Sequence, residues 1–195
     1  MMMRFGALVG MALAVCASSA LAQETGDVSQ KVAICGACHG TVGVPADASY
    51  PVIWGQYTGY IFIELRDYQT GARKNPIMAA VVQGMSHADM LAIGEYFGAK
   101  PWPDLNQPSA PGEVATQAES MATSGQCTQC HLGGFLGQGT NPRLAGQSIQ
   151  YLRATMINFH TGARGNNPWM SALLKTFSDK NIDDMARYLG GLSSH

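Results

Sequence analysis

One pattern occurs twice in this sequence, and this duplication limits the fold more than any other feature of the chain. Three segments recur in the same order, each 91 or 92 residues after its first copy. The first is C-x-x-C-H, which starts at Cys35 and again at Cys127. The second is Thr-Gly-Ala-Arg, which ends at Arg73 and at Arg164. The third is Asn-Pro-x-Met, which ends at Met78 and at Met170. Two copies are too few for a solenoid, which needs three or more repeats. The sequence therefore predicts two similar domains.

Each C-x-x-C-H motif has the spacing for covalent attachment of a haem. Cysteines three positions apart share one helix face, so both thiols can reach the vinyl groups of one porphyrin and form thioethers. The histidine that follows then places its imidazole under the iron. We expect two covalently bound haem c groups, with these residues as cysteine attachments and proximal ligands: Cys35, Cys38 and His39, and Cys127, Cys130 and His131.

Other uses of paired cysteines agree less well with this spacing. Four cysteines in an exported protein would ordinarily indicate two disulfides. A redox-active, thioredoxin-like pair would need a βαβ setting, which the sequence does not show. A zinc ribbon places its two pairs about 15–20 residues apart. Here 89 positions separate Cys38 from Cys127, and a histidine follows each pair at once. Haem attachment is therefore favoured over a disulfide, a redox pair or a zinc site.

The repeat also identifies a second axial ligand for each iron. Of the methionines after residue 22, only Met78 and Met170 are methionine in both halves, and each follows its motif histidine by 39 residues. His87 and His160 are competing ligands, but neither is histidine in both halves, so we expect surface or structural roles for them. The other methionines are predicted to lie in the core: Met85, Met90, Met121, Met156 and Met185.

Ligation by histidine and methionine has functional consequences. The soft thioether sulfur prefers reduced iron and raises the haem potential. Two protein ligands also fill both axial positions, which leaves no open site for substrate or oxygen. This favours electron transfer over catalysis at the iron, and we expect the protein not to be an enzyme.

The hydrophobic pattern predicts an all-α protein with a similar helix order in each half. Ser86, with Asp89 three residues later, resembles a capping box, and Gly71 suits a helix end in the left-handed conformation. The expected helices cover 27–39, 59–70, 76–82 and 86–98, and then 113–131, 148–161, 168–176 and 178–190.

The N-terminal segment 1–22 has the pattern of a secretory signal peptide. Arg4 precedes an apolar run over 5–17, and Ala20-Leu21-Ala22 forms a cleavage site. An uncleaved anchor, or a lipoprotein processed at Cys16, is the alternative. We expect export to the periplasm.

A proline-rich linker separates the two predicted domains. Four of the nine prolines lie in 101–112, where they prevent a helix and favour a semi-rigid spacer. The alternative is a segment that only wraps the surface. The expected domains are 23–100 and 113–195.

Several residues are candidates for contacts around the haems. A proximal histidine usually donates its second ring N–H to an acceptor, and the carbonyls of Pro51 and Pro142 are the candidates. Arg73 and Arg164 either meet haem propionates or oppose a helix dipole as helix-end cations. Trp169, beside Met170, packs either on the second haem or in the core.

Composition narrows the choice of partners. Charged residues make up only 13% of the chain, and 12 Lys and Arg stand against 13 Asp and Glu. Without a basic surplus, we expect no nucleic-acid partner. After the signal segment no apolar run reaches 18 residues, so we expect no integral membrane span. Peripheral association with a membrane stays open.

Over about 25–192, the motifs and their duplicated order resemble the dihaem cytochrome c4 family. The resemblance implies two tandem class I cytochrome c-like domains and a periplasmic electron carrier that passes electrons toward terminal oxidases. The family's axial ligands correspond here to His39 with Met78 and His131 with Met170. Trp54 departs from the pattern, since the other half has the small Ala145 there. This departure removes no ligand, but it leaves the redox partner undecided.

Three functions remain to be distinguished. The first is a carrier in a respiratory chain, with a cytochrome bc complex, a terminal oxidase or a dehydrogenase as redox partner. The second is the dihaem subunit of a dehydrogenase complex, such as a flavocytochrome c sulfide dehydrogenase. The third is a haem enzyme such as a peroxidase, which requires an open or displaceable axial position.

Overall fold

The computed structural model describes residues 28–192. The predicted signal peptide, 1–22, lies outside this range. Within it the regular structure is helical, apart from one isolated bridge between Gln138 and Asn141. This confirms the predicted all-α class.

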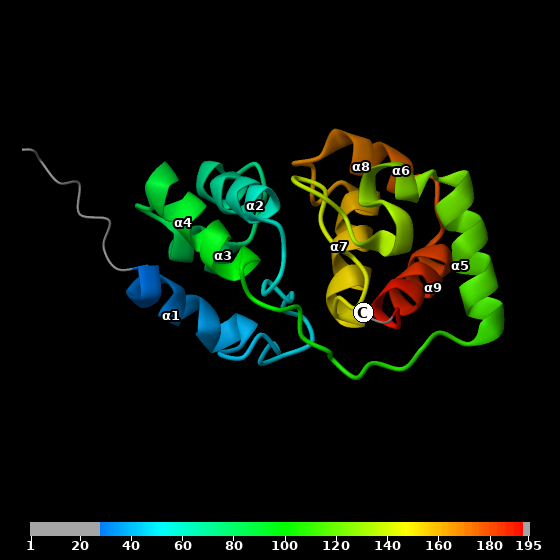
Figure 1. Ribbon diagram of the computed structural model, residues 1–195. Coiled ribbons are helices and arrows are strands. Elements are labelled where there is room, and N and C mark those ends of the chain that lie inside the picture. Colours follow the sequence, from blue (N-terminus) through cyan, green and yellow to red (C-terminus); the bar gives the residue numbers. More distant parts are fainter. Residues whose placement is uncertain (1–27, 193–195) are drawn as a thin grey trace, which may run out of the picture.

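The helices form two lobes joined by an extended segment (Figure 1). The first lobe contains α1 (Val28–His39), α2 (Thr58–Thr70), α3 (Pro76–Val82) and α4 (His87–Gly98). The second contains α5 (Gly112–Ser124), α6 (Cys127–His131), the 3₁₀ turn η1 (Gly133–Phe135), α7 (Ile149–Thr161), α8 (Pro168–Leu174) and α9 (Asp179–Gly190).

Local sequence signals account for the helix ends. The Ser86 hydroxyl accepts from the Asp89 backbone N–H while the Asp89 carboxylate accepts from the Ser86 N–H, which confirms the predicted capping box. Gly71 ends α2 with φ 78°, in the left-handed region that glycine enters without steric cost. The helices therefore begin and end close to where the sequence predicts them, with one clear exception.

That exception is the helix expected over 113–131. Here α5 stops at Ser124 and a separate short helix, α6, starts at Cys127. Between them Gln126 has φ 52° and ψ 33°, a left-handed conformation that cannot continue a right-handed helix. The prediction of one continuous helix was therefore wrong. The first half, in contrast, runs through its motif in the single helix α1.

Each lobe has its own hydrophobic core. In the first, α2 packs against α4, and α4 also contacts α1; in the second, α9 packs against α5 and α7. The predicted core methionines are confirmed, since Met90, Met121, Met156 and Met185 are buried and the half-buried Met85 packs against the first core. Two separate cores match the expected arrangement of two similar domains.

The proline-rich segment is fastened to the second lobe. The Gln107 side chain donates to the carbonyls of Gln147 (2.9 Å) and Gly190 (3.0 Å) and accepts from the Ile149 N–H (2.8 Å). The Arg143 guanidinium also lies over the Trp102 ring, 4.7 Å from its centroid. The segment therefore joins the two lobes as the predicted linker (Figure 1) and also lies against the start of α7 and the end of α9.

Candidate haem sites

Local helical structure positions both cysteine pairs. Cys35 and Cys38 lie in the last turns of α1, and Cys127 and Cys130 lie in α6. All four thiols are free rather than paired in disulfides. Burial raises the pKa of the Cys35 and Cys127 thiols. Both thiols are therefore protonated at neutral pH before any thioether forms, and each pair has the i, i+3 spacing that one porphyrin requires.

Both motif histidines are buried and held by a proline carbonyl, as predicted. The Nδ1 of His39 lies 2.8 Å from the Pro51 oxygen, and the Nδ1 of His131 lies 2.9 Å from the Pro142 oxygen. Because a carbonyl only accepts, Nδ1 carries the proton and Nε2 keeps a lone pair for a metal. Burial lowers the pKa of both histidines, although the proline carbonyl opposes this effect. Each ring is therefore a neutral, oriented imidazole, the form that ligates iron.

The two candidate methionines occupy equivalent places at helix starts. Met78 is the third residue of α3, and its backbone N–H donates to the Asn75 side chain at 3.0 Å. Met170 is the third residue of α8, and its backbone N–H likewise donates to the Asn167 side chain at 3.2 Å. Both side chains are half-buried and pack against the core of their own lobe. The repeat thus preserves the local geometry around each methionine as well as its spacing.

In the second lobe the motif and the methionine line one cavity. Its wall includes Cys127, Cys130, His131 and Met170 together with apolar side chains from α5, α7, α8 and α9. A mostly apolar wall that carries two thiols, an imidazole and a thioether fits a porphyrin with covalent attachment and two axial ligands. The residues of this lobe therefore fit the predicted cofactor.

Trp169 also lines that cavity but is 86% exposed. The alternative that Trp169 belongs to the core is therefore wrong, and its place at the cavity wall agrees with packing on the second haem. The His160 Nδ1–H donates to the Leu174 carbonyl, 3.0 Å away, and the exposed His87 packs edge-on against Phe62. Both histidines have the structural or surface roles that the sequence predicts.

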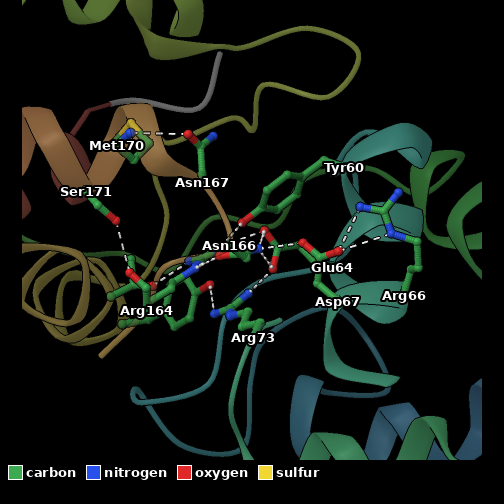
Figure 2. Close-up of polar contacts among 12 residues, drawn as sticks. Tyr60, Glu64, Arg66, Asp67, Arg73, Arg164, Asn166, Asn167, Met170 and Ser171 are labelled. Atoms are coloured by element: carbon green, nitrogen blue, oxygen red, sulfur yellow. Dashed lines mark hydrogen bonds and ion pairs between the residues drawn. The ribbon is translucent and has the colours of Figure 1, made fainter. Parts of the chain in front are cut away.

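The two arginines of the repeat meet at one carboxylate between the lobes. Glu64 on α2 pairs with Arg73 of its own half at 2.6 Å and with Arg164 of the other half at 2.5 Å. Figure 2 shows this cluster, in which Asn166 also donates to Asp67 at 2.8 Å. Both guanidiniums thus lie between the lobes, and the two predicted roles, contact with propionates and opposition to a helix dipole, stay predictions.

Tyrosines from both halves complete the charged cluster. Arg73 donates to the Tyr151 hydroxyl at 3.1 Å, and Arg164 donates to the Tyr60 hydroxyl at 3.4 Å. Burial raises the pKa of Tyr151, but the two guanidiniums outweigh it and leave the pKa below its ordinary value. For Tyr60 burial prevails, with a further contribution from Glu64, and raises the pKa. The cluster is thus an electrostatic link between the lobes.

Two glutamines form a second, reciprocal link. The Gln147 amide bonds both the N–H (2.8 Å) and the carbonyl (3.0 Å) of Val52 in the first half. The Gln56 amide does the same for Arg143 in the second half, at 3.0 Å from its N–H and 3.1 Å from its carbonyl. Gln56 and Gln147 occupy equivalent positions of the repeat. Their pairing with the opposite half makes the interface nearly symmetric.

Sequence reasoning missed the roles of Glu64 and of this glutamine pair. The glutamines had left a signal, because they recur in register in both halves although neither continues an apolar stripe. Glu64 left none, since its counterpart in the second half is Thr155.

Among residues 28–192, no single helix has the length and apolar character to cross a membrane. The consecutive helices α3 and α4 meet those criteria only as a pair, across a bend of 110°.

Comparison with known proteins places this arrangement in a family. Residues 113–189 match the family described as "Cytochrome C oxidase, cbb3-type, subunit III". The chain is 31% identical over 170 residues to the "Thiosulfate dehydrogenase electron acceptor" of Stutzerimonas stutzeri, covering 81% of this chain and 78% of the relative. It is 30% identical over 195 residues to cytochrome c4 of Azotobacter vinelandii, covering 88% and 92%.

A solved structure extends the likeness to the fold. The reduced recombinant cytochrome c4 of Pseudomonas stutzeri superposes with a TM-score of 0.76 at 27% identity, covering 85% of this chain and 97% of that one. The duplicated haem motifs, the helix order and these similarities agree. The chain therefore belongs to the dihaem cytochrome c4 family, with two covalently bound haem c groups.

Proposed function

We propose that this protein is a periplasmic electron carrier, not an enzyme, with His39 and Met78 as axial ligands of one iron and His131 and Met170 as ligands of the other. One observation carries the proposal. Each half places a histidine oriented by a proline carbonyl and, 39 residues later, a methionine at the start of an asparagine-capped helix. The proposed attachment residues are the motif cysteines: Cys35, Cys38, Cys127 and Cys130.

The chain's own residues then account for electron transfer. When bound, each haem supplies reversible one-electron chemistry. The buried, neutral histidine and the methionine would hold both axial positions, which would leave no coordination site for a substrate. The soft methionine sulfur favours the reduced iron and raises the potential. Because both ligands would stay in place in either oxidation state, little reorganisation would accompany each electron. Redox partners would bind through small, transient interfaces.

The organisation of the chain follows from this function. We propose that 1–22 is a signal peptide that directs export, that 23–100 and 113–195 are the two cytochrome domains, and that 101–112 connects them. The connection lies along the second domain through Gln107, which limits the orientations open to it. A fixed pair of haem domains suits a carrier that accepts an electron at one end and delivers it at the other.

For partners, we propose redox proteins of a respiratory chain, with delivery toward a terminal oxidase. A second candidate is service as the electron-accepting subunit of a dehydrogenase. The observation that favours it is the likeness to a relative named as the electron acceptor of a thiosulfate dehydrogenase. Both functions require the same haem ligands. The two functions therefore differ in the redox partner that the protein binds and not in the haem sites.

Purification and ligand binding test the proposal together. We expect the matured protein to be isolated without a stoichiometric flavoprotein or dehydrogenase, and to be reoxidised by membranes that contain a terminal oxidase. A stoichiometric dehydrogenase would instead support the second candidate. A high-spin ferric spectrum with fast cyanide or peroxide binding would contradict both, because it requires an open axial position.

A further inference from the structure

The two interface glutamines hold the peptide units that orient the proximal histidines. The Pro51 carbonyl, which accepts from His39, and the Val52 N–H, which donates to Gln147, belong to the same peptide unit. A peptide unit is planar and rigid, so whatever fixes its N–H also fixes its carbonyl. Each glutamine therefore acts on the histidine of the opposite domain, not on the histidine of its own.

The second half shows the same arrangement in reverse. The peptide unit between Pro142 and Arg143 accepts from His131 through its carbonyl and donates to Gln56 through its N–H. Gln56 lies in the first half, so each domain supplies the side chain that anchors the other domain's histidine loop. The distances agree closely between halves: 2.8 and 2.9 Å at the histidines, and 2.8 and 3.0 Å at the glutamine oxygens.

Burial makes these contacts rigid. Gln56 and Gln147 are each only 3% exposed. The Gln147 amide oxygen also accepts from the Ser148 N–H of its own domain at 2.9 Å, and the Gln56 oxygen accepts from the Tyr57 N–H at 3.1 Å. Each oxygen thus lies between one N–H from its own domain and one from the other. Without it, buried backbone groups would lose their partners, which is costly.

The electronic effect follows from hydrogen-bond cooperativity. A peptide whose N–H donates to a good acceptor has a more polarised carbonyl, which accepts more strongly in turn. A stronger acceptor at the histidine Nδ1–H makes the imidazole a more basic ligand. A more basic ligand stabilises ferric iron and lowers the haem potential, since hydrogen bonding around a ligand is one of the means by which a protein tunes it.

We propose that Gln147 and Gln56 are crosswise positioning residues, each of which sets the proximal histidine hydrogen bond, and thereby the potential, of the haem in the opposite domain. The inference rests on the proposed axial ligands His39 and His131. It gives the interface a role beyond adhesion, because docking of the two domains itself tunes both haems.

The test uses the matured full-length dihaem protein and two variants, Gln147→Ala and Gln56→Ala. Spectroelectrochemical titration yields both potentials, and Met78→Ala and Met170→Ala assign each potential to its haem. We expect Gln147→Ala to raise the potential of the haem on Cys35 and Cys38 only. Gln56→Ala should raise the potential of the other haem only.

The shift in haem potential should correspond to a fraction of the free energy of one hydrogen bond, because the histidine keeps its bond to the proline carbonyl and only the strength of that bond changes. At a fixed solution potential near the midpoint, the ratio of ferrous to ferric iron in the affected haem should rise about threefold. In the NMR spectrum, the resonance of the Nδ1–H proton on the histidine of the affected haem should shift as well. A shift in the glutamine's own domain, equal shifts in both haems, or no shift would each overturn the proposal.

Two further variants separate tuning from adhesion. Ser148→Ala removes another bond across the interface, from the Ser148 hydroxyl to the Ala48 carbonyl, and both potentials should stay unchanged. Gln147→Glu keeps an acceptor for the Val52 N–H but replaces the donor to the Val52 carbonyl by an oxygen. At a pH that ionises this carboxyl, the substitution should lower the potential of the first haem more than that of the second. If Gln147→Ala does not mature, the sign and location of the Gln147→Glu shift decide.

Failure of the proposed function would be visible separately. If the axial ligands were wrong, the unmodified protein would lack the spectrum of histidine–methionine ligation, or Met78→Ala would leave both haem spectra unchanged. If that spectrum and the methionine effects are present but the crosswise pattern is absent, only the role of the glutamines fails.

Discussion

The two halves of the molecule share the geometry of their candidate ligands but differ in what surrounds it. Histidine-to-proline distances of 2.8 and 2.9 Å and asparagine caps of 3.0 and 3.2 Å recur in both. The helix that carries the haem motif is continuous in α1, whereas in the second half it is broken before α6. At the interface, Glu64 and Asp67 of the first half correspond to the neutral Thr155 and Asn158 of the second.

This difference shows which features the duplication retained and which it changed. The residues proposed to hold a haem recur, as expected if each half binds the same cofactor. The charges between the lobes differ. If the residues at the Glu64 position were the same in both halves, the two arginines would face either two carboxylates or none. A single Glu64 accepts from Arg73 and Arg164 together, and Asn166 reaches across from a segment that is one residue longer in the second copy.

The largest expected effect comes from removing that asymmetric charge. Glu64→Ala leaves two buried guanidiniums without their carboxylate, and we expect a loss of about 3 kcal/mol in the free energy of unfolding. The matched change in the second half, Thr155→Ala, removes only a bond from Arg164 (2.7 Å) and should cost about 1 kcal/mol. Chemical unfolding followed by circular dichroism measures both. Equal losses would show that the charge asymmetry has no energetic weight.

A smaller effect on stability is expected from alanine substitutions at the close helix contacts in each half. Gly98 and Gly190 are equivalent. A Cβ at Gly190 would meet the Ile149 side chain first and would lie 2.9 Å from the Gln147 carbonyl oxygen, a backbone atom that cannot rotate away. A Cβ at Gly98 would meet chiefly the Thr58 hydroxyl, at 2.8 Å, a side-chain atom that can rotate away. We expect Gly190→Ala to cost about 2 kcal/mol and Gly98→Ala about half of that. The same unfolding experiment decides, and a larger loss for Gly98→Ala would contradict this packing difference.

The smallest expected effect is a response to acid in the first half alone. The hydrogen bond from Lys31, together with the Ser86 backbone N–H, lowers the pKa of Asp89 from 3.8 to about 2. The equivalent capping residue in the second half, Asn181, does not titrate. Because the folded pKa is depressed, the stabilisation is present above about pH 4 and is lost as the pH falls toward 2.

Asp89→Asn should abolish this pH dependence and keep the capping bond. Since Asp89 and Lys31 are partly exposed, we expect a contribution of only about 0.5 kcal/mol. Unfolding free energies of the two proteins between pH 2 and 5 provide the measurement. The curves should converge at the acid end, and parallel curves would contradict the assignment.

The repeat made much of the fold and the candidate ligands predictable from the sequence. Its register predicted the helix order, the proline carbonyls at His39 and His131, and the core methionines. These features depend on local spacing and on comparison of the two copies. The break before α6 was not predicted, because it depends on a left-handed backbone at Gln126, a conformation that is uncommon for residues other than glycine.

Contacts between the lobes could not be predicted in the same way. Glu64 and Arg164 are 100 residues apart, and Gln147 and Val52 are 95 apart. Such pairs depend on how two independently packed cores dock, which no periodicity within one copy encodes. The recurrence of Gln56 and Gln147 indicated that these positions matter but not which backbone they hold.

The central claim is that two equivalent histidine–methionine sites exist, and redox titration with spectra of Met78→Ala and Met170→Ala tests it most directly. Each variant should lose the weak long-wavelength band of a methionine–iron bond from one haem and lower the potential of that haem, while the other haem keeps both properties. If either variant left both haems with unchanged spectra and potentials, that ligand assignment and the equivalence of the two halves would be wrong.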